Sequence, residues 1–346
     1  MNSDLRIVFV LGLGAMGILS SCGNNAGSKK GATATEATPA SAWVNPHKGK
    51  IWEKENVVKI PLTAVENELR GAVKSVAYKE YELTDESGSN TKTLVDSGYN
   101  AYDRAGRLVD QNEYFGDKAP KWHCVYQYDA NNKPQEWHLK IFEENMNATT
   151  VFKYDDKGNK TEETTTDANK EYNRRAVYKY DARGNQVGAN MYDKDGKLKQ
   201  VITYEYDSRG FQTAYIERDE DSEVLVKLTC AYDANGNKTG GADYSSDTTL
   251  ESKWVQQNDA QGRRVETDYY TPDGKLLEKR TIKYDNAGYL VEYNTYKPDG
   301  SLNEEKSYSF TNEYDQKGNI VKQTEIRWKS GKRLPVTYSE YVISYY

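Results

Sequence analysis

Few residues in this chain have the types and spacing that catalysis or metal binding requires. Of the three histidines, His47 lies in a polar N-terminal stretch, and His123 and His138 are 15 residues apart with no ligand partner at metal-binding spacing. The chain contains no GxSxG, phosphate-loop, HExxH or paired CxxC motif. Asp recurs in short turns, but a calcium loop gathers several oxygens within one loop, so turn chemistry explains these residues better. We therefore predict no metal, no cofactor and no enzymatic activity.

Aromatic side chains are the residues best suited to bind a ligand. The sequence has 29 Tyr and 6 Trp residues, several of them at matching places in a repeat. Rings in a row on a repeat protein can stack on sugars, and the same rings can instead close the core of a sheet. The candidate ligand-binding residues are Trp122, Trp137, Tyr192, Tyr244, Trp254, Tyr270, Tyr296 and Trp328. The sequence leaves both roles open and favours core packing.

Cys22 ends an N-terminal stretch that resembles a bacterial lipoprotein signal. Arg6 precedes an apolar run from Ile7 to Leu19, which is too short to anchor stably in a bilayer. The run ends in Leu-Ser-Ser-Cys, which resembles a lipobox, and this resemblance implies cleavage before Cys22 and acylation of its sulfur and new amino terminus. We expect a signal peptide over residues 1–21 and a lipid anchor on Cys22. An ordinary secretory signal peptide is the alternative.

Residues 22–50 form a Gly, Ala, Thr and Ser-rich stretch that predicts a flexible tether. No acidic run follows Cys22. In Bacteroidota-type lipoproteins such a run resembles the signal for export to the cell surface, so its absence favours an outer-membrane protein facing the periplasm, with the cell surface as the alternative. The net charge is −6 and no basic stripe occurs, which argues against nucleic acid as a partner.

A Tyr-Asp-x-x-Gly motif organises the rest of the chain. It returns seven times in succession at intervals of 26 residues and once more after 30, which indicates a repeat architecture. The Asp can accept hydrogen bonds from the turn backbone, and the Gly can adopt positive φ without strain. One copy has Asn132 in place of the Gly, the next best residue for that conformation. The best-preserved copies predict turns at Tyr154, Asp155 and Gly158; at Tyr180, Asp181 and Gly184; and at Tyr206, Asp207 and Gly210.

Each repeat also shows strand periodicity. Apolar residues such as Ala176 and Tyr178 stand at every second position before the motif's Tyr, which indicates a half-buried strand. A second strand follows, and then a second turn with an Asp 15 residues after the Tyr in most copies. We therefore predict an all-β fold in which tandem antiparallel β-hairpins form a coiled or superhelical open sheet, with the Tyr row on its concave face. A parallel β-helix is the alternative, but two reversal turns per repeat argue against it.

Cys124 and Cys230 remain after lipidation. Both fall on the apolar row of the repeats, four repeats apart, so an uncurled sheet would separate them by about 40 Å, too far for a disulfide. We predict two buried free thiols.

The YDxxGN turns resemble the YD repeats of the Rhs and teneurin families over roughly residues 72–346. In those families the hairpins wind into a hollow β-shell, in some cases around a toxin. This chain has a longer period, fewer repeats and no DPxG-like cleavage signature, so the toxin-enclosing role is not carried over. It is more similar to small YD-repeat lipoproteins of Bacteroidota.

The sequence thus divides into a signal peptide (1–21), a tether (22–50) and a repeat domain (51–346) with an N-terminal cap at 51–100. We expect a monomeric, non-enzymatic outer-membrane lipoprotein that acts as a structural or protein-interaction scaffold, offering its curved face or a free sheet edge to an envelope protein. Glycan or peptidoglycan binding through the aromatic residues is the alternative function.

Overall fold

The computed structural model describes residues 69–86, 89–329 and 331–346. The predicted signal peptide, Cys22, the predicted tether and the part of the predicted cap before residue 69 lie outside these described residues.

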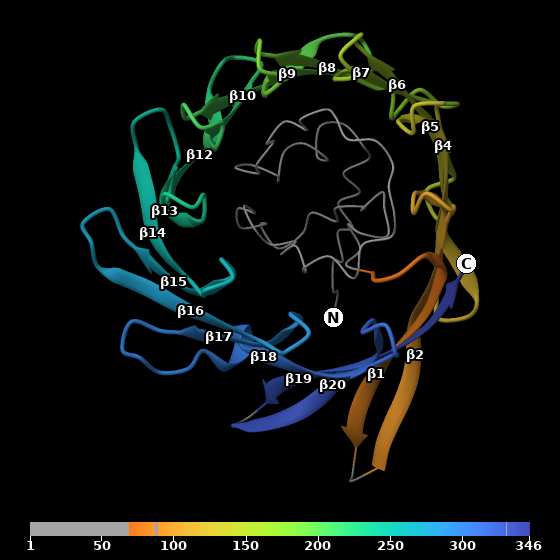
Figure 1. The fold of residues 1–346 in the computed structure, drawn as a ribbon, viewed down its shortest axis with the longest axis vertical. Helices are drawn as coiled ribbons and strands as arrows, with labels where there is room; N and C mark the ends of the chain where they lie inside the picture. Colours follow the sequence, from red (N-terminus) through yellow and green to blue (C-terminus); the bar gives the residue numbers. More distant parts are fainter. Residues whose placement is uncertain (1–68, 87–88, 330) are drawn as a thin grey trace, which may run out of the picture.

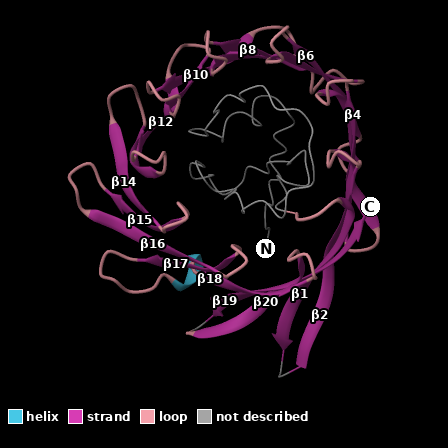
Figure 2. Ribbon diagram, viewed as in Figure 1, coloured by secondary structure: helices cyan, strands magenta, loops and turns pink. Residues whose placement is uncertain are grey.

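Strands dominate the described chain, which holds no α-helix (Figure 2). The first ten strands are β1 (Val73–Glu86), β2 (Ser89–Tyr102), β3 (Leu108–Phe115), β4 (Ala119–Tyr128), β5 (Pro134–Ile141), β6 (Met146–Tyr154), β7 (Lys160–Asp167), β8 (Arg174–Tyr180), β9 (Gln186–Tyr192) and β10 (Leu198–Tyr206). The others are β11 (Gln212–Asp219), β12 (Val224–Tyr232), β13 (Lys238–Tyr244), β14 (Leu250–Asn258), β15 (Arg264–Tyr270), β16 (Leu276–Tyr284), β17 (Leu290–Tyr296), β18 (Tyr308–Tyr314), β19 (Ile320–Lys329) and β20 (Lys332–Tyr345). A short 3-10 helix, η1 (Glu304–Lys306), precedes β18.

The strands form one closed 20-stranded antiparallel β-barrel (Figure 1). Each strand pairs with the next along the chain, and β20 pairs with β1 through residues Val73 to Glu82. The all-β hairpin prediction is confirmed, but the prediction of an open sheet is wrong. Twist and tilt bring the two terminal strands together, and their pairing satisfies backbone groups that an open edge would leave free. Twenty strands spaced about 4.8 Å apart give a ring on the order of 30–40 Å across.

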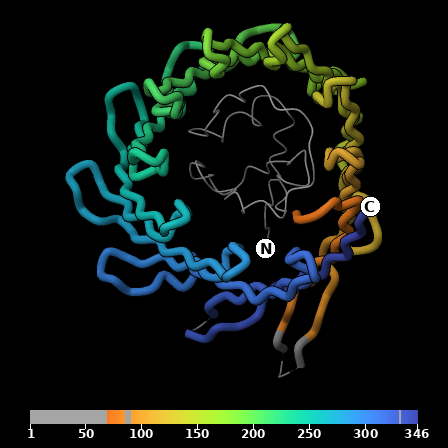
Figure 3. Tube along the Cα trace, in the orientation of Figure 1, coloured from red at the N-terminus to blue at the C-terminus, as the bar shows by residue number. Residues whose placement is uncertain are grey.

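The two ends of the sheet meet at a seam, where the first and last parts of the described chain lie side by side (Figure 3). At the seam the hydroxyls of Ser75 and Ser344 are 2.6 Å apart, and the rings of Tyr78 and Tyr341 pack with centroids 6.5 Å apart. Strands β1, β2 and β20 have 14 residues each, against 7 to 10 in the other strands. The predicted N-terminal cap is therefore half of the closing joint, because its hairpin pairs with the last strand instead of covering a free edge.

The sheet has two unlike faces. The Tyr-row face, defined by the motif Tyr and the residues two and four before it, carries the buried side chains; in β6, buried Phe152 and Thr150 alternate with exposed Lys153 and Val151. One core cluster on this face extends from Val73 to Phe152, and a second from Ala176 to Tyr215. The strand alternation predicted from sequence is confirmed.

The opposite face is polar and crossed by ion pairs. Lys153 binds Glu162 at 2.6 Å, and the same repeat positions pair Lys283 with Glu292 at 2.7 Å. Exposed pairs of this kind contribute about 0–1 kcal/mol each to stability, so their main effect is to keep this face hydrated. Among the described residues, no helix is long and apolar enough to cross a membrane.

Cys124 and Cys230 are buried and form no disulfide with each other, as the sequence predicted. Burial raises the pKa of the Cys124 thiol to about 12, so it stays protonated near neutral pH.

Candidate functional site

The turn after each motif Tyr, here called the YD turn, has the geometry that the sequence predicted. In the turn after β8, the N–H of Asp181 donates to the carbonyl of Asn185 at 2.9 Å, and Gly184 donates back to Asp181 at 3.1 Å. The Asp181 carboxylate accepts the backbone N–H groups of Arg183 and Asn185 and the Asn185 side chain, at 2.8–2.9 Å. Gly184 has φ of 87°, and Asn132 takes the same left-handed conformation at 65°.

The turn carboxylates are held in their charged form. In the turn after β6, the side-chain amide of Asn159 donates to Asp155 at 2.9 Å, and this bond lowers the pKa of Asp155. Asn237 does the same for Asp233. The Asn of the YDxxGN motif therefore stabilises the charged form of the Asp carboxylate in the same turn.

The motif Tyr makes a long-range bond that the sequence did not reveal. Its hydroxyl donates to the backbone carbonyl 20 residues earlier, at the start of the second strand of the preceding repeat. The bonds join Tyr128 to Leu108, Tyr154 to Pro134, Tyr180 to Lys160, Tyr206 to Gln186, Tyr232 to Gln212 and Tyr284 to Arg264, at 2.6–3.1 Å. Each of these six YD turns is thereby tied to the preceding repeat across the sheet. Tyr314, after the 30-residue interval, donates instead to the Asp285 carboxylate.

The copy that lacks Tyr keeps this bond. Asn258 stands at the Tyr position, and its side-chain nitrogen donates to the carbonyl of Lys238 at 2.7 Å, again 20 residues earlier. The hydrogen bond, and not only the aromatic ring, is therefore part of what the position supplies.

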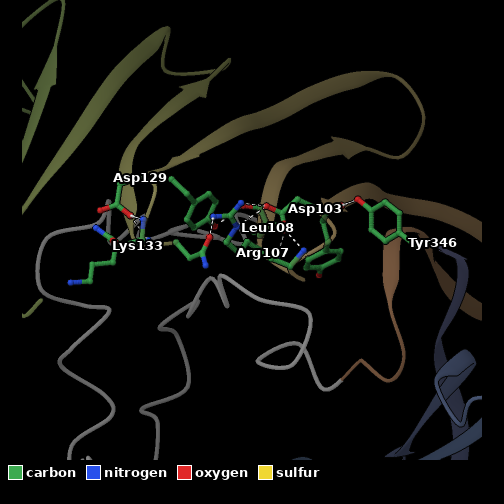
Figure 4. Close-up of polar contacts among 11 residues, drawn as sticks. Asp103, Arg107, Leu108, Asp129, Lys133 and Tyr346 are labelled. Atoms are coloured by element: carbon green, nitrogen blue, oxygen red, sulfur yellow. Dashed lines mark hydrogen bonds and ion pairs between the residues drawn. The ribbon is translucent and has the colours of Figure 1, made fainter. Parts of the chain in front are cut away.

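Neighbouring YD turns also contact each other through Arg side chains. Arg107 of one turn donates to Asn132 of the next at 2.7 Å, and Arg209 donates to the Asp233 carbonyl at 2.7 Å. Figure 4 shows Asp103 and Arg107 of the first YD turn beside Asp129 and Lys133 of the second. Tyr346, at the chain end, donates its hydroxyl to the Tyr102 carbonyl just before the first turn. The YD turns form one connected edge of the ring, called here the YD rim.

The turns between repeats, here called second turns, form the opposite edge, the second rim. In Figure 1 the turns after β14, β16 and β18 project toward the middle of the ring, and those before these strands project outward. Several second turns share the YD backbone pattern: the N–H of Asp193 donates to the carbonyl of Lys197 at 2.9 Å, and that of Gly196 donates to Asp193 at 3.1 Å, with Gly196 at φ of 77°. Their residue types vary more, since Lys170 and Ser222 take the positive φ in two of them.

The eight candidate aromatic residues do not form one row. Trp137 is 6% exposed and packs edge-on against Tyr126 and Phe152, with centroids 5.8 and 4.9 Å away. Trp254, 8% exposed, packs in a core cluster with Cys230, and Trp122 packs against the first core cluster. Trp137 and Trp254 belong to the core, so their assignment to an exposed platform is wrong, whereas Trp122 is half-buried at its edge. Trp328 lies apart from them, near the end of β19 beside Arg333.

The other four candidates share one position at the second rim. Tyr192, Tyr244, Tyr270 and Tyr296 each end a second strand, 12 residues after the motif position, and are half-buried. We call them the tyrosine ladder. Their preceding neighbours, such as Met191, are on the Tyr-row face, so strand alternation places the ladder on the opposite face.

Each ladder Tyr has a cation on one side and a Leu on the other. The strand register sets Tyr192 opposite Arg175 and Tyr244 opposite Lys227, with the cations 5.5 and 4.8 Å from the ring centroids. In the strand register Tyr270 and Tyr296 stand opposite Lys253 and Lys279. On the other side the partners are Leu198, Leu250, Leu276 and Leu302. Tyr244, Tyr270 and Tyr296 lie in consecutive repeats, two strands or about 10 Å apart.

Buried charges on the Tyr-row face were missed by sequence reasoning. Glu163 is 1% exposed and pairs with Lys160 at 2.6 Å. Arg280 lies 4.4 Å from the Tyr269 ring centroid and pairs with Glu278, which also binds Lys306 at 2.9 Å. The available signal was a charged residue at an expected core position, such as Glu163 nine residues after Tyr154. Within the described ranges, no group of three or more His, Cys, Asp or Glu residues is placed to hold a metal ion.

Comparison with known proteins does not place the chain in a family. No family model matches it, and no curated protein matches it. A porin-like protein from Bacteroides uniformis is similar in structure at 12% identity and a TM-score of 0.35, covering 82% of this chain and 98% of that one. A TcdB2-TccC3 structure without its hypervariable C-terminal region is similar at 14% identity and a TM-score of 0.37, over 75% of this chain. This chain spans 15% of that protein, and the resemblance to YD repeats stays a prediction.

Proposed function

We propose that the protein is a non-enzymatic lipoprotein of the outer membrane, anchored through Cys22, that acts as a binding scaffold for an envelope protein. The observation that supports this most is the tyrosine ladder with its flanking Lys, Arg and Leu residues. Tyr and Arg side chains are enriched at protein interfaces and among the residues that carry most of their binding energy. Exposed Leu225 and Leu277, 48% and 44% exposed, lie near the same rim and widen the apolar part of this surface.

The ladder replaces the free sheet edge as the proposed contact surface. Strand addition requires unpaired strand edges, and here the terminal strands β1 and β20 pair with each other. The partner therefore contacts side chains on the opposite face.

Site-specific photo-crosslinking in cells tests this proposal. A photoreactive phenylalanine analogue at Tyr270 is expected to capture one discrete envelope protein, and the same analogue at Tyr99 is the matched control. Tyr99 is 37% exposed but lies on β2, away from the ladder. The captured band should disappear when Tyr244 and Tyr296 are changed to Ala. Equal capture at both sites, or none, would contradict a protein partner at the ladder.

Glycan binding is a second candidate, favoured by the regular spacing of three ladder rings. Rings about 10 Å apart suit stacking on alternate sugars of an extended chain. In affinity electrophoresis, soluble peptidoglycan fragments should retard the protein, and Tyr270→Ala should weaken the retardation at least tenfold while Tyr99→Ala leaves it unchanged. Equal mobility with and without the fragments would exclude this candidate.

A further inference from the structure

The described chain enters the ring at the YD rim. The backbone N–H of Arg70 donates to the Asn319 side chain at 2.6 Å, and the Asn319 amide donates to the Arg70 carbonyl at 2.8 Å. The Arg70 guanidinium lies 5.2 Å from the Tyr289 ring centroid. Tyr289 and Asn319 belong to the YD turns after β16 and β18, so residue 70 is fixed against that rim immediately before β1 begins.

The two rims differ in charge. The nine YD turns, counted from each Asp to the residue four after it, hold ten acidic and eight basic side chains. The second-rim segments hold sixteen acidic and nine basic side chains; they are residues 116–118, 142–145, 167–171, 193–197, 219–223, 245–249, 271–275, 297–306, 329 and 331–332.

The first Asp of a turn accepts its own turn amides at both rims, as Asp181 and Asp193 do, so the difference lies in the charges exposed at the tips. In the YD turns the exposed charged side chains are mostly cations, such as Arg104, Arg183 and Lys317. In the second turns, exposed acidic side chains outnumber exposed basic ones. The YD rim therefore presents cations outermost, whereas the second rim carries a large acidic excess.

From this placement we propose that the YD rim rests on the anionic lipid surface and that the second rim, with the tyrosine ladder, points away from it. The proposal depends on the lipid anchor at Cys22 proposed above. Cations are attracted to an anionic membrane surface, and the acidic rim is repelled over about one Debye length.

The entry point of the chain supports the same orientation. Arg70, at the start of the described chain, is bound to Asn319 at the YD rim. The chain that follows Cys22 therefore joins the ring on the side that the proposal places against the lipid.

The two ends of one strand provide a matched test. Asn235 lies in the YD turn before β13, and Thr248 lies in the second turn after it; both are exposed, and their turns hold them through backbone amides. Full-length lipidated Asn235→Cys and Thr248→Cys proteins would each be labelled with a thiol-reactive fluorophore. Wild-type protein taken through the same labelling is the control, since Cys124 and Cys230 are buried.

The labelled proteins would be reconstituted into vesicles of phosphatidylethanolamine and phosphatidylglycerol that carry a headgroup quencher. We expect at least threefold stronger quenching of the Asn235→Cys probe than of the Thr248→Cys probe. Equal quenching, or stronger quenching at Thr248→Cys, would overturn the orientation while leaving the anchor intact if the protein still floats with the vesicles. Failure to float would overturn the anchor and the orientation together. An unchanged ratio on zwitterionic vesicles would overturn the role of charge.

Discussion

The YD turns and the second turns share one backbone design but differ in how much of the molecule depends on them. The YD turns and the second turns that begin at Asp193, Asp219, Thr271 and Lys297 close with the same pair of backbone bonds and a left-handed residue. Only the YD turns add a motif Tyr or Asn bonded 20 residues back, and several add an Arg bonded to the next turn. A turn supported by local bonds alone tolerates Lys170 or Ser222 at its left-handed position, whereas the connected YD rim keeps Gly at eight of nine positions.

Alkaline pH should have the largest effect on stability, because it ionises many buried tyrosines of the Tyr-row face at once. Burial raises the pKa of Tyr180 to about 12 and also raises that of Tyr154 and Tyr204. The fold favours the neutral form, so the stabilisation present below the unfolded-state pKa of about 10 is lost as pH rises through the folded-state value.

Tyrosine ionisation, followed by absorbance at 295 nm, should therefore coincide with loss of the far-ultraviolet circular dichroism signal. Ionisation of most tyrosines near pH 10 with the sheet intact would show that the motif tyrosines are not held neutral by the fold.

Glycine substitutions separate the two rims directly. A methyl group added at Gly236 in a YD turn would lie 2.4 Å from the Phe211 ring, which stacks on Tyr232, and φ there is 81°. At Gly196 in a second turn there is no atom within 4 Å, so only the backbone strain remains. We expect Gly236→Ala to cost about 2–3 kcal/mol and Gly196→Ala about 1 kcal/mol, measured by urea unfolding. Equal losses would mean that the Phe211 ring moves away from the added methyl group at no cost in stability.

The two turn carboxylates of repeat four give a smaller difference. Asp181 accepts three hydrogen bonds, and Asp193 accepts two, from the N–H groups of Asp195 and Lys197. Asp181→Ala should cost about 2 kcal/mol and Asp193→Ala about 1 kcal/mol. Thermal unfolding of the two variants side by side measures this, and a larger loss for Asp193→Ala would reverse the ranking of the rims.

Removing a single hydroxyl should have the smallest effect. Tyr206→Phe deletes the 2.7 Å bond to the Gln186 carbonyl and is expected to cost about 1 kcal/mol. Tyr192→Phe, on the tyrosine ladder, removes only a 3.4 Å contact with Asn190 and should cost close to nothing. If the two variants unfold at the same urea concentration, the long-range bond adds no stability.

The local features of this fold could be predicted from sequence because they repeat. The 26-residue period, the Asp and Gly chemistry of the YD turns and the left-handed Asn132 all follow from neighbouring residues. Closure could not be predicted in this way. It pairs Ser75 with Ser344, 269 residues apart, and depends on the twist and tilt summed over all the strands.

The candidate site was only partly predictable because each YD turn shifts the strand register by one residue. The pairing goes from Lys179 with Gly188 to Tyr180 with Gln186, which leaves Val187 as the extra residue. Beyond the turn, odd offsets from the motif Tyr therefore share its face. Trp137, nine residues after Tyr128, thus falls in the core, and Tyr192, twelve after Tyr180, falls on the opposite face.

Closure through β1 and β20 sets how this ring can grow. Every repeat adds one up-and-down strand pair, so gaining or losing a whole repeat keeps the strand number even and leaves the terminal strands antiparallel. One repeat changes the circumference by about 10 Å along the hydrogen bonds and the diameter by about 3–4 Å. Duplication of a 26-residue segment is therefore a route to wider or narrower relatives that needs no new joint, and the ladder would lengthen by one position with each copy.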